Sequence, residues 1–228
     1  MAGGRGTRLK PYTDTVPKPL VPITKDRPIL DVIISQLVKY GFTHITLAVN
    51  HKAESIIEYC GTGSKWGITI DYVRESEPLH TIGPLTLISD LPENFLVMNG
   101  DTLTDLDYGA FLREHITSGA PITVSTKRRE MKIDFGVLNL DDNDMLTDFT
   151  EKPTHIAHVI MGVNAISRSV VESIVKGKWY GFDDLMRDSL AIGRKVKVRP
   201  HDGFWIDIGC PEDYRFAVEH FEEIQGLL

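Results

Sequence analysis

The sequence predicts an α/β fold in which a mostly parallel sheet is covered by helices on both faces, giving three layers. Two observations carry this prediction. From residue 29 to about residue 130, apolar runs typical of buried strands alternate with segments of helical periodicity, and this β-α-β-α rhythm is typical of a parallel sheet. After about residue 130 the rhythm becomes irregular, which predicts an inserted lobe of mixed α and β structure.

The first half, about residues 1–130, supplies the sheet and its helices. A helix is expected over 29–42, because apolar residues recur there at helical spacing and Gly41 is a suitable C-terminal cap. The elements expected after it are a strand over 44–50, a helix over 53–60, a strand over 68–76, a helix over 84–91, a strand over 94–101, a helix over 106–119 and a strand over 121–129. Ligands bind such sheets at the carboxyl ends of strands, so the loops after Asn50 and Asp101 are expected to border a cleft.

The second half, about residues 131–228, begins with an expected hairpin. Residues 134–140 and 145–153 flank LDDNDM, a segment rich in turn-forming residues. The elements expected after the hairpin are a strand over 158–167, a helix over 181–193, a strand over 196–203 and a closing helix over 211–224. Pro211 suits the first turn of the closing helix, where an N–H group would have no partner within the helix.

Composition excludes several classes of protein. The net charge of -7 argues against broad nucleic-acid binding, which needs a basic face. The sequence has neither an apolar run of about 18 residues nor the apolar stretch of a signal peptide, so we expect no membrane association. Cys60 and Cys210 lie far apart and lack metal-ligand spacing, which predicts two reduced thiols in a cytoplasmic protein.

The first ten residues, MAGGRGTRLK, combine flexible backbone with positive charge. Glycines let a loop approach a ligand closely, and its N–H groups can then converge on phosphate oxygens. Arginine binds phosphate in a bidentate manner. The segment lacks the G-K-[ST] ending of a P-loop and the spacing of the dinucleotide fingerprint, so by itself it is equally consistent with a basic surface turn.

The longer pattern is more specific. Motifs along the whole chain resemble, in family order, those of the sugar-1-phosphate nucleotidylyltransferases, which are also called nucleotide-sugar pyrophosphorylases. They are AGGRGTRLKPYTDTVPKPLVPI, SEPLHTIGPLTL, NGDTL, FGVL, FTEKP, MGVNAIS and WIDIGCPEDY. The resemblance implies one nucleotidyltransferase domain over 1–228, with a Rossmann-like nucleotide-binding half and a sugar-phosphate-binding half. It also implies that a nucleoside triphosphate and a sugar 1-phosphate react to give a nucleotide sugar and pyrophosphate.

The resemblance also implies roles for individual residues. Arg8 would neutralise the leaving pyrophosphate, and Lys18 would contact the α-phosphate and the sugar phosphate. Asp101, the third catalytic residue, would bind Mg²⁺ together with Asp207. The implied nucleotide-binding residues are Ala2, Gly3, Gly4, Gly6, Thr7, Arg8, Leu79, Thr81, Gly83, Asn99 and Gly100. The implied sugar-phosphate-binding residues are Gly136, Glu151, Lys152 and Asn164.

These residue types suit the chemistry. A sugar phosphate is already anionic near neutral pH, since its second pKa is about 6, and its attacking oxygen therefore needs no general base. The barrier is the repulsion between two phosphoanions, which fixed cations and a divalent metal ion lower. Mg²⁺ prefers one or two carboxylates with phosphate oxygens and water. Asp101 follows an apolar strand and Asp207 lies within another, FWIDIG, where an unpaired carboxylate would be costly to bury.

Two segments depart from the family pattern. Family members carry an apolar strand immediately before AGG, whereas only Met1 and Ala2 precede Gly3 here. We therefore expect the first strand to be missing from the sheet, and this form to be less stable than one extended upstream.

The base-reading segment is commonly L-G-T-A-G-P-L, but here His80 replaces a glycine and Ile82 a small residue. Its G-P-L form, together with WIDIGCPEDY, favours guanine and resembles the GDP-mannose and heptose guanylyltransferases.

Several alternatives stay open at the level of sequence. The base could be uridine, thymidine or cytidine, and the sugar is not specified. A catalytically inactive nucleotide-sugar-binding paralogue would share the fold, but it would have no need for the four groups Arg8, Lys18, Asp101 and Asp207. A glycosyltransferase would not need the triphosphate loop. An exposed sheet edge in the second half favours a homodimer, and the other expected partners are the two substrates.

Overall fold

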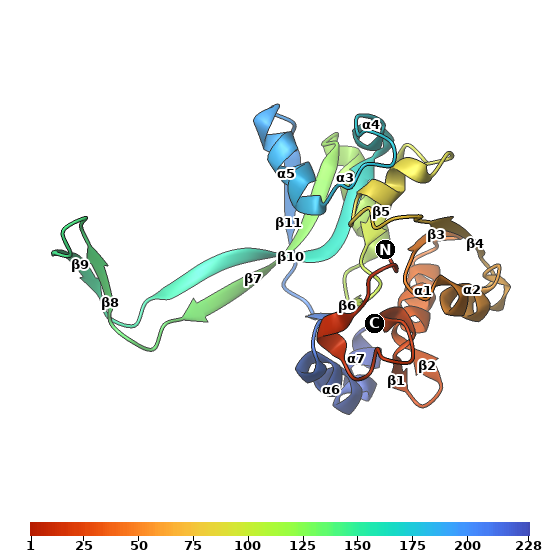
Figure 1. The fold of residues 1–228 in the computed structure, drawn as a ribbon, viewed down its shortest axis with the longest axis horizontal. Helices are drawn as coiled ribbons and strands as arrows, with labels where there is room; N and C mark the ends of the chain where they lie inside the picture. Colours follow the sequence, from red (N-terminus) through yellow and green to blue (C-terminus); the bar gives the residue numbers. More distant parts are fainter.

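The computed structural model describes residues 1–228, and in it a long two-stranded arm projects from the body formed by the other elements (Figure 1). The elements of the first half are η1 (Thr7–Leu9), η2 (Lys18–Leu20), β1 (Pro22–Thr24), β2 (Arg27–Pro28), α1 (Ile29–Lys39), β3 (His44–Val49), α2 (Ala53–Cys60), η3 (Ser64–Trp66), β4 (Thr69–Arg74), η4 (Gly83–Leu87), β5 (Asn94–Met98), β6 (Thr102–Thr104) and α3 (Tyr108–Ser118). The expected alternation of strands and helices in this half is confirmed. One exception is the helix expected over 84–91, which is only the short 3-10 turn η4.

The second half contains β7 (Ile122–Lys132), β8 (Val137–Leu140), β9 (Leu146–Thr150), β10 (Thr154–Ser167), α4 (Arg168–Glu172), α5 (Phe182–Ala191), β11 (Val196–Pro200), β12 (Trp205–Asp207), α6 (Pro211–Glu219) and α7 (Phe221–Leu227). The expected hairpin is present as β8 and β9. The expected closing helix is divided into α6 and α7, which meet at His220. No helix of the structure combines the length and apolar character needed to span a membrane.

The expectation of a mostly parallel sheet was wrong. The largest sheet has the order β11-β7-β10-β5, and β10 is antiparallel to both of its neighbours. Parallel pairing is confined to β3 with β4 and to β11 with β7. The reason is the connection between β7 and β10, which is the β8–β9 hairpin. A parallel arrangement would require a crossover, usually a helix, that returns the chain to the level of the start of β7, and this connection contains no helix.

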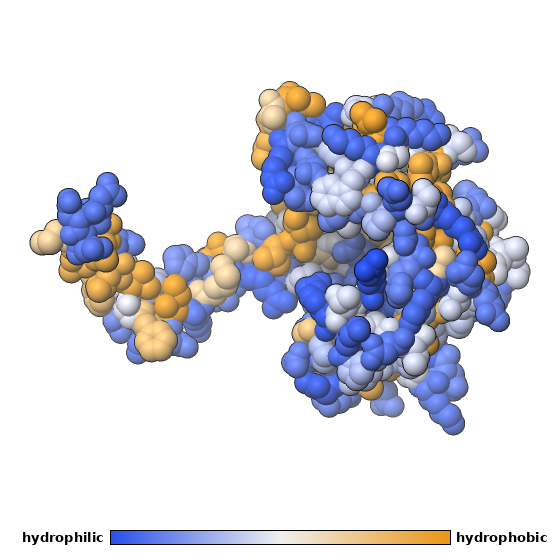
Figure 2. Space-filling view, viewed as in Figure 1, coloured by the Kyte–Doolittle hydropathy of each residue, from blue (hydrophilic) through white to orange (hydrophobic).

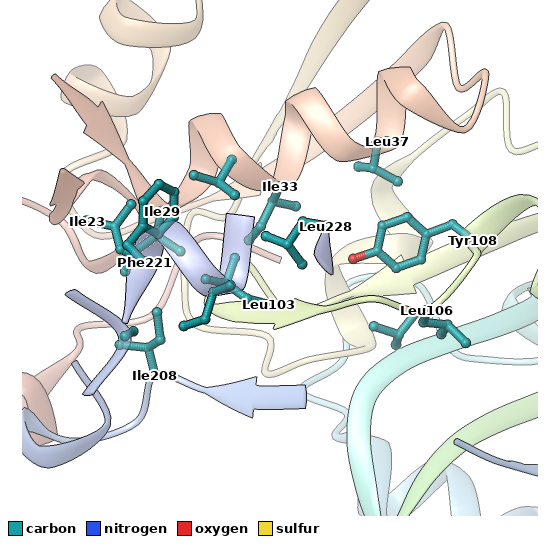
Figure 3. Packing of buried hydrophobic residues seen from close by; sticks show 14 of the residues in the cluster. Ile23, Ile29, Ile33, Leu37, Leu103, Leu106, Tyr108, Ile208, Phe221 and Leu228 are labelled. Atoms are coloured by element: carbon teal, nitrogen blue, oxygen red, sulfur yellow. The ribbon is translucent and has the colours of Figure 1, made fainter. Parts of the chain in front are cut away.

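The main apolar core joins the two ends of the chain. Ile29 and Ile33 of α1 pack with Leu103 of β6, Ile208 and Phe221, and all five side chains are almost completely buried (Figure 3). Burial of each such side chain contributes roughly 1.5–3 kcal/mol. This core contains Leu103 of β6 and Ile208 directly after β12, and it therefore holds in place the neighbouring carboxylates of the site described below, Asp101 before β6 and Asp207 at the end of β12.

The first three residues lie between the carboxyl ends of β3 and β5. The ammonium group of Met1 donates to the Met98 carbonyl at 2.7 Å, and the Ala2 N–H donates to the Ala48 carbonyl at 2.8 Å. Burial lowers the pKa of this ammonium group below its ordinary value. Behind it, β3 and β5 do not pair with each other. A largely apolar cavity of about 550 Å³ lies there instead, lined by residues that include Leu47 and Leu96.

Candidate active site

The glycine-rich segment forms a tight loop that ends at η1. Gly6 has a φ of +62°, a left-handed conformation that glycine adopts at little cost. A Cβ at this position would lie 2.9 Å from Thr13 Cγ2 and 3.0 Å from Lys18 Cβ. The Thr13 hydroxyl donates to the Gly6 carbonyl at 2.9 Å, which fixes the turn. In contrast, a Cβ at Gly4 would have no neighbour within 4 Å, so the loop is open on that side.

Lys18 and Asp101 form a buried ion pair beside this loop. Lys18 Nζ lies 2.5 Å from Asp101 Oδ2, and the two side chains are 11% and 21% exposed. Lys18 is the first residue of η2, and Pro17 before it has an extended backbone conformation. Asp101 lies just beyond the end of β5, as expected from the apolar strand that precedes it. The pair therefore joins two segments that are far apart in the sequence.

A second carboxylate lies on the neighbouring strand. β12 pairs with β6 so that Asp207 is opposite Thr102, and the Ile208 N–H donates to the Asp101 carbonyl at 3.0 Å. Burial raises the pKa of Asp207, and the nearby charge of Asp101 raises it further. Lys18 and Arg8 act in the opposite direction. The four groups for which the family resemblance implies charge neutralisation and metal binding therefore lie in one region, with Asp207 within the influence of the other three.

The carboxylate pair suits a divalent cation. Asp101 Oδ1 is buried and has no hydrogen-bond partner, and a buried carboxylate oxygen without a partner is costly. The negative charge of Asp101 lies near Asp207 and disfavours its ionised form, and a cation between the two carboxylates would offset this repulsion. The structure contains no group of three or more His, Cys, Asp and Glu side chains that could hold a metal ion, so a cation at Asp101 and Asp207 would need further oxygen ligands from outside the protein. Such a pair suits Mg²⁺, which is bound by one or two carboxylates and completes its coordination with phosphate oxygens and water.

The expected base-reading segment is anchored to the chain before α5. The N–H groups of Ile82 and Gly83 donate to the Tyr180 carbonyl at 3.0 and 2.9 Å. A Cβ at Gly83 would lie 2.5 Å from the Lys178 carbonyl oxygen, so only glycine allows this approach. His80 has a φ of +69°, a left-handed conformation for which glycine is the favoured residue.

A small cavity brings together three of the residues that the sequence singled out. Thr81, Asn99 and Asn164 line a cavity of about 100 Å³ beside Met1 and Phe182. The Asn164 side chain is 5% exposed, and its Oδ1 atom has no hydrogen-bond partner. Since buried polar atoms are nearly always paired, this amide oxygen is available to a ligand hydroxyl group.

Sequence reasoning missed two residues that hold the loops. Glu75 lies next to Gly3, where a Cβ would be 3.0 Å from Glu75 Oε1, and its Oε2 accepts the Leu79 N–H at 2.8 Å. Burial raises the pKa of Glu75. Lys52 Nζ donates to the Thr13 and Asp14 carbonyls at 3.2 and 2.8 Å. Both residues follow strands at the edge where ligands were expected, and this position was the signal that could have identified them.

Three sugar-side residues lie elsewhere. Gly136, Glu151 and Lys152 are close together, since a Cβ at Gly136 would lie 3.1 Å from Glu151 Oε2 and Lys152 Nζ is 4.0 Å from Glu151 Oε1. They flank the β8–β9 hairpin at the outer end of the arm, well away from η1, η2 and β6 (Figure 1). The structure therefore does not bring these residues to the Lys18–Asp101 pair of the same chain.

Fold and site together define an α/β protein in which a glycine-rich loop, fixed cations and two carboxylates lie close together. Comparison with known families shows to which family of such proteins the chain belongs. Residues 1–224 match the family model described as nucleotidyl transferase, and the chain belongs to that family. The resemblance found in the sequence is thereby confirmed.

Individual relatives differ in the substrates named for them. The chain is 32% identical over 218 residues to a D-glycero-alpha-D-manno-heptose 1-phosphate guanylyltransferase of Campylobacter jejuni, covering 94% of this chain and 95% of that protein. It is 31% identical over 248 residues to a UTP--glucose-1-phosphate uridylyltransferase of Synechocystis, covering 100% of this chain. The chain spans 62% of the Synechocystis protein and 59% of a mannose-1-phosphate guanylyltransferase catalytic subunit of Drosophila pseudoobscura.

Solved structures support the same family. The chain superposes on the crystal structure of HddC from Yersinia pseudotuberculosis with a TM-score of 0.73 and 29% identity, covering 96% of each chain. HddC complexed with GMP-PN matches with a TM-score of 0.70 and 27% identity, again over 96% of each chain.

Proposed function

We propose that the chain is a Mg²⁺-dependent sugar-1-phosphate nucleotidylyltransferase that uses GTP. It would transfer the guanylyl group to a hexose- or heptose-like 1-phosphate, giving a GDP-sugar and pyrophosphate. One observation carries the proposal. The Lys18–Asp101 ion pair lies at the glycine-rich loop, and Asp207 lies on the adjacent strand. This combination places fixed positive charge and two carboxylates where a triphosphate would meet the loop.

The reaction needs positioning and charge neutralisation. An oxygen of the sugar phosphate attacks the α-phosphorus and forms a new P–O bond. The bond between the α-phosphorus and the bridging oxygen breaks, and its electron pair leaves with pyrophosphate. Lys18 would hold the α-phosphate and the incoming phosphate, and Arg8 would neutralise the leaving group. In phosphoryl transfer, one well-placed cation is worth roughly 10³–10⁵ in rate.

Asp101 and Asp207 would hold the metal ion. When bound, Mg²⁺ would supply positive charge to the phosphate oxygens and orient them. The open side of the loop at Gly4 leaves room for the phosphates, because no protein atom lies within 4 Å of a Cβ built there. The free Asn164 Oδ1 would accept a hydrogen bond from a sugar hydroxyl in the small cavity.

Two findings favour GTP as the nucleotide. The Campylobacter relative, which the chain covers almost completely, is named a guanylyltransferase, and HddC crystallised with GMP-PN. Uridylyl transfer is the second candidate, because the Synechocystis uridylyltransferase aligns with the whole of this chain at similar identity.

A pyrophosphate-release panel tests the proposal. Each nucleoside triphosphate is offered with mannose, glucose or heptose 1-phosphate, with and without Mg²⁺. We expect release only with Mg²⁺, and the highest kcat/KM with GTP. A preference for UTP would establish the uridylyl alternative, and release with none of the pairs would indicate an inactive nucleotide-sugar-binding protein.

Variants test the site itself. Asp101→Asn should abolish release while the far-ultraviolet circular dichroism spectrum stays unchanged. Asp26→Asn is the matched control, because Asp26 is an exposed acid in the turn between β1 and β2. Near-normal release by Asp101→Asn would show that the assignment of this carboxylate is wrong.

A further inference from the structure

The arm, residues 127–160, exposes an unusual amount of apolar surface. On the hairpin, β8 and β9 pair so that Leu138 lies opposite Phe149 and Leu140 opposite Leu146. Residues directly opposite in an antiparallel pair share a face. These four side chains therefore form one apolar face, and each is between 53% and 59% exposed. Figure 2 shows apolar side chains along the arm with no covering element.

A lone two-stranded ribbon needs a partner. Such a ribbon is at best marginally stable in water, and a third strand or another packed element is normally required. Further apolar side chains on the arm are also about half exposed or more, namely Met131, Phe135, Met145, Ile156 and Ile160. At roughly 100 Å² each, the apolar side chains of the arm expose on the order of 900 Å², compared with the roughly 800 Å² that each partner buries in a standard interface.

Contacts with the body hold the root of the arm, so that the arm points away from the body. Lys127 Nζ donates to the Asp202 and Gly203 carbonyls at 2.6 and 2.5 Å. The Trp205 indole N–H donates to the Met161 carbonyl at 2.9 Å, and the Arg129 guanidinium lies over the Trp205 ring at 5.3 Å. These contacts hold both strands of the arm against the segment that leads into β12.

The strands of the arm are continuous with those of the body. β7 is buried over its first five residues, exposed towards its end, and paired with β10 in the arm from Thr126 to Lys132. At about 3.3 Å per residue, these six steps carry the hairpin roughly 20 Å outward. Folding the arm back onto its own body would bend both strands where they leave the body and would break the contacts at the root.

The chemistry of the two parts is complementary. The body carries the Lys18–Asp101 pair and the unpartnered Asn164 amide oxygen. The arm carries Glu151 and Lys152, whose side chains are 62% and 65% exposed and which lie between β9 and β10. Together the two parts contain the groups expected for a sugar-phosphate site, but one chain holds them apart.

We propose that each active site is shared between two copies of this chain: the arm of one copy covers the sugar-phosphate site of the other and supplies Glu151 and Lys152. This inference rests on the proposed function. A reciprocal exchange about a two-fold axis would close the assembly and bury both apolar hairpin faces. The occupant of the hairpin face is therefore the body of a second copy.

Complementation between two inactive variants tests the sharing. One chain carries Asp101→Asn with an intact arm, and the other carries Glu151→Ala and Lys152→Ala with an intact body. Each variant alone should be inactive. A heterodimer purified through two different tags should regain about half of the wild-type turnover per dimer, because one of its two sites then has every group intact.

The outcomes separate this inference from the proposed function. An inactive heterodimer beside an active wild type would overturn the sharing and leave the proposed function standing, and so would an arm variant that is active alone. If the wild type itself releases no pyrophosphate, sedimentation tests whether two chains associate through their arms. The wild type should then sediment as two chains, and Leu138→Ser with Phe149→Ser should sediment as one. Leu190→Ser is the control, since Leu190 is 76% exposed but lies on α5. A wild type that sediments as one chain would overturn the inference.

Discussion

Replacing Lys18 by methionine removes the cation at the centre of the proposed site and keeps the length of the side chain. Lys18 and Asp101 are 11% and 21% exposed, with 2.5 Å between their charged atoms. Leaving one member of a fully buried pair alone costs about 3–5 kcal/mol. Because the Asp101 side chain is still 21% exposed, we expect the variant to lose about 2–3 kcal/mol in free energy of unfolding and its Tm to fall by roughly 5–10 °C.

The same change should have a much larger effect on the reaction. Loss of a fixed cation at the α-phosphate should reduce kcat by about 10³-fold or more, measured as pyrophosphate release at saturating Mg²⁺. The double variant Lys18→Met with Asp101→Asn then separates the two effects. It should recover more than half of the lost Tm, because no charge remains buried alone, and it should recover no activity.

Two results would contradict these expectations for Lys18. If Lys18→Met kept kcat within tenfold of the wild type, Lys18 would not contact the reacting phosphates. If the double variant were no more stable than Lys18→Met, the 2.5 Å contact would not be the source of the instability.

Three further predictions follow from the structure. Gly6→Ala should lower both Tm and turnover, because the new Cβ would lie 3.0 Å from Lys18 Cβ on a left-handed backbone. Gly4→Ala is the control and should leave Tm unchanged, since no atom lies within 4 Å of a Cβ there. Equal melting temperatures for the two variants would contradict this prediction. An extension of about five apolar β-branched residues ahead of Met1 should enter the cavity between β3 and β5 and raise Tm, whereas a polar extension of equal length should not. Burial lowers the pKa of His115 below 6.5, so its contribution to stability is present above 6.5 and is lost as the pH falls through that value. Chemical denaturation at about pH 8 and about pH 5.5 should show this loss, and His115→Gln should reduce it; an unchanged difference would exclude His115 as the source.

Much of the nucleotide half could be predicted from sequence, because its signals are local. The apolar strands β3 and β5 and the helices α1 and α3 each show their own periodicity. Gly6 could be predicted as part of a tight turn, and Asp101 as an acid at a strand end. The closeness of Asp101 and Asp207 came from family resemblance, since pairing of β6 with β12 joins residues about a hundred positions apart.

The second half was harder to predict for a physical reason. β10 was expected over 158–167 but begins at Thr154, because the polar residues of THIAHV lie on an exposed ribbon and leave no pattern of burial. Its antiparallel place in the sheet depends on the hairpin connection, which no local propensity encodes. The separation of Glu151 from the Lys18–Asp101 pair likewise depends on the direction of the arm.

In the proposed function, the glycine-rich loop, Lys18 and the two carboxylates form one site for nucleotidyl transfer. A crystal structure with Mn²⁺ and a non-hydrolysable GTP analogue, read by anomalous scattering, tests it most directly. We expect a manganese peak between Asp101 and Asp207, with the α-phosphate within reach of Lys18 Nζ. A triphosphate bound away from the loop, or a metal peak remote from both aspartates, would contradict it.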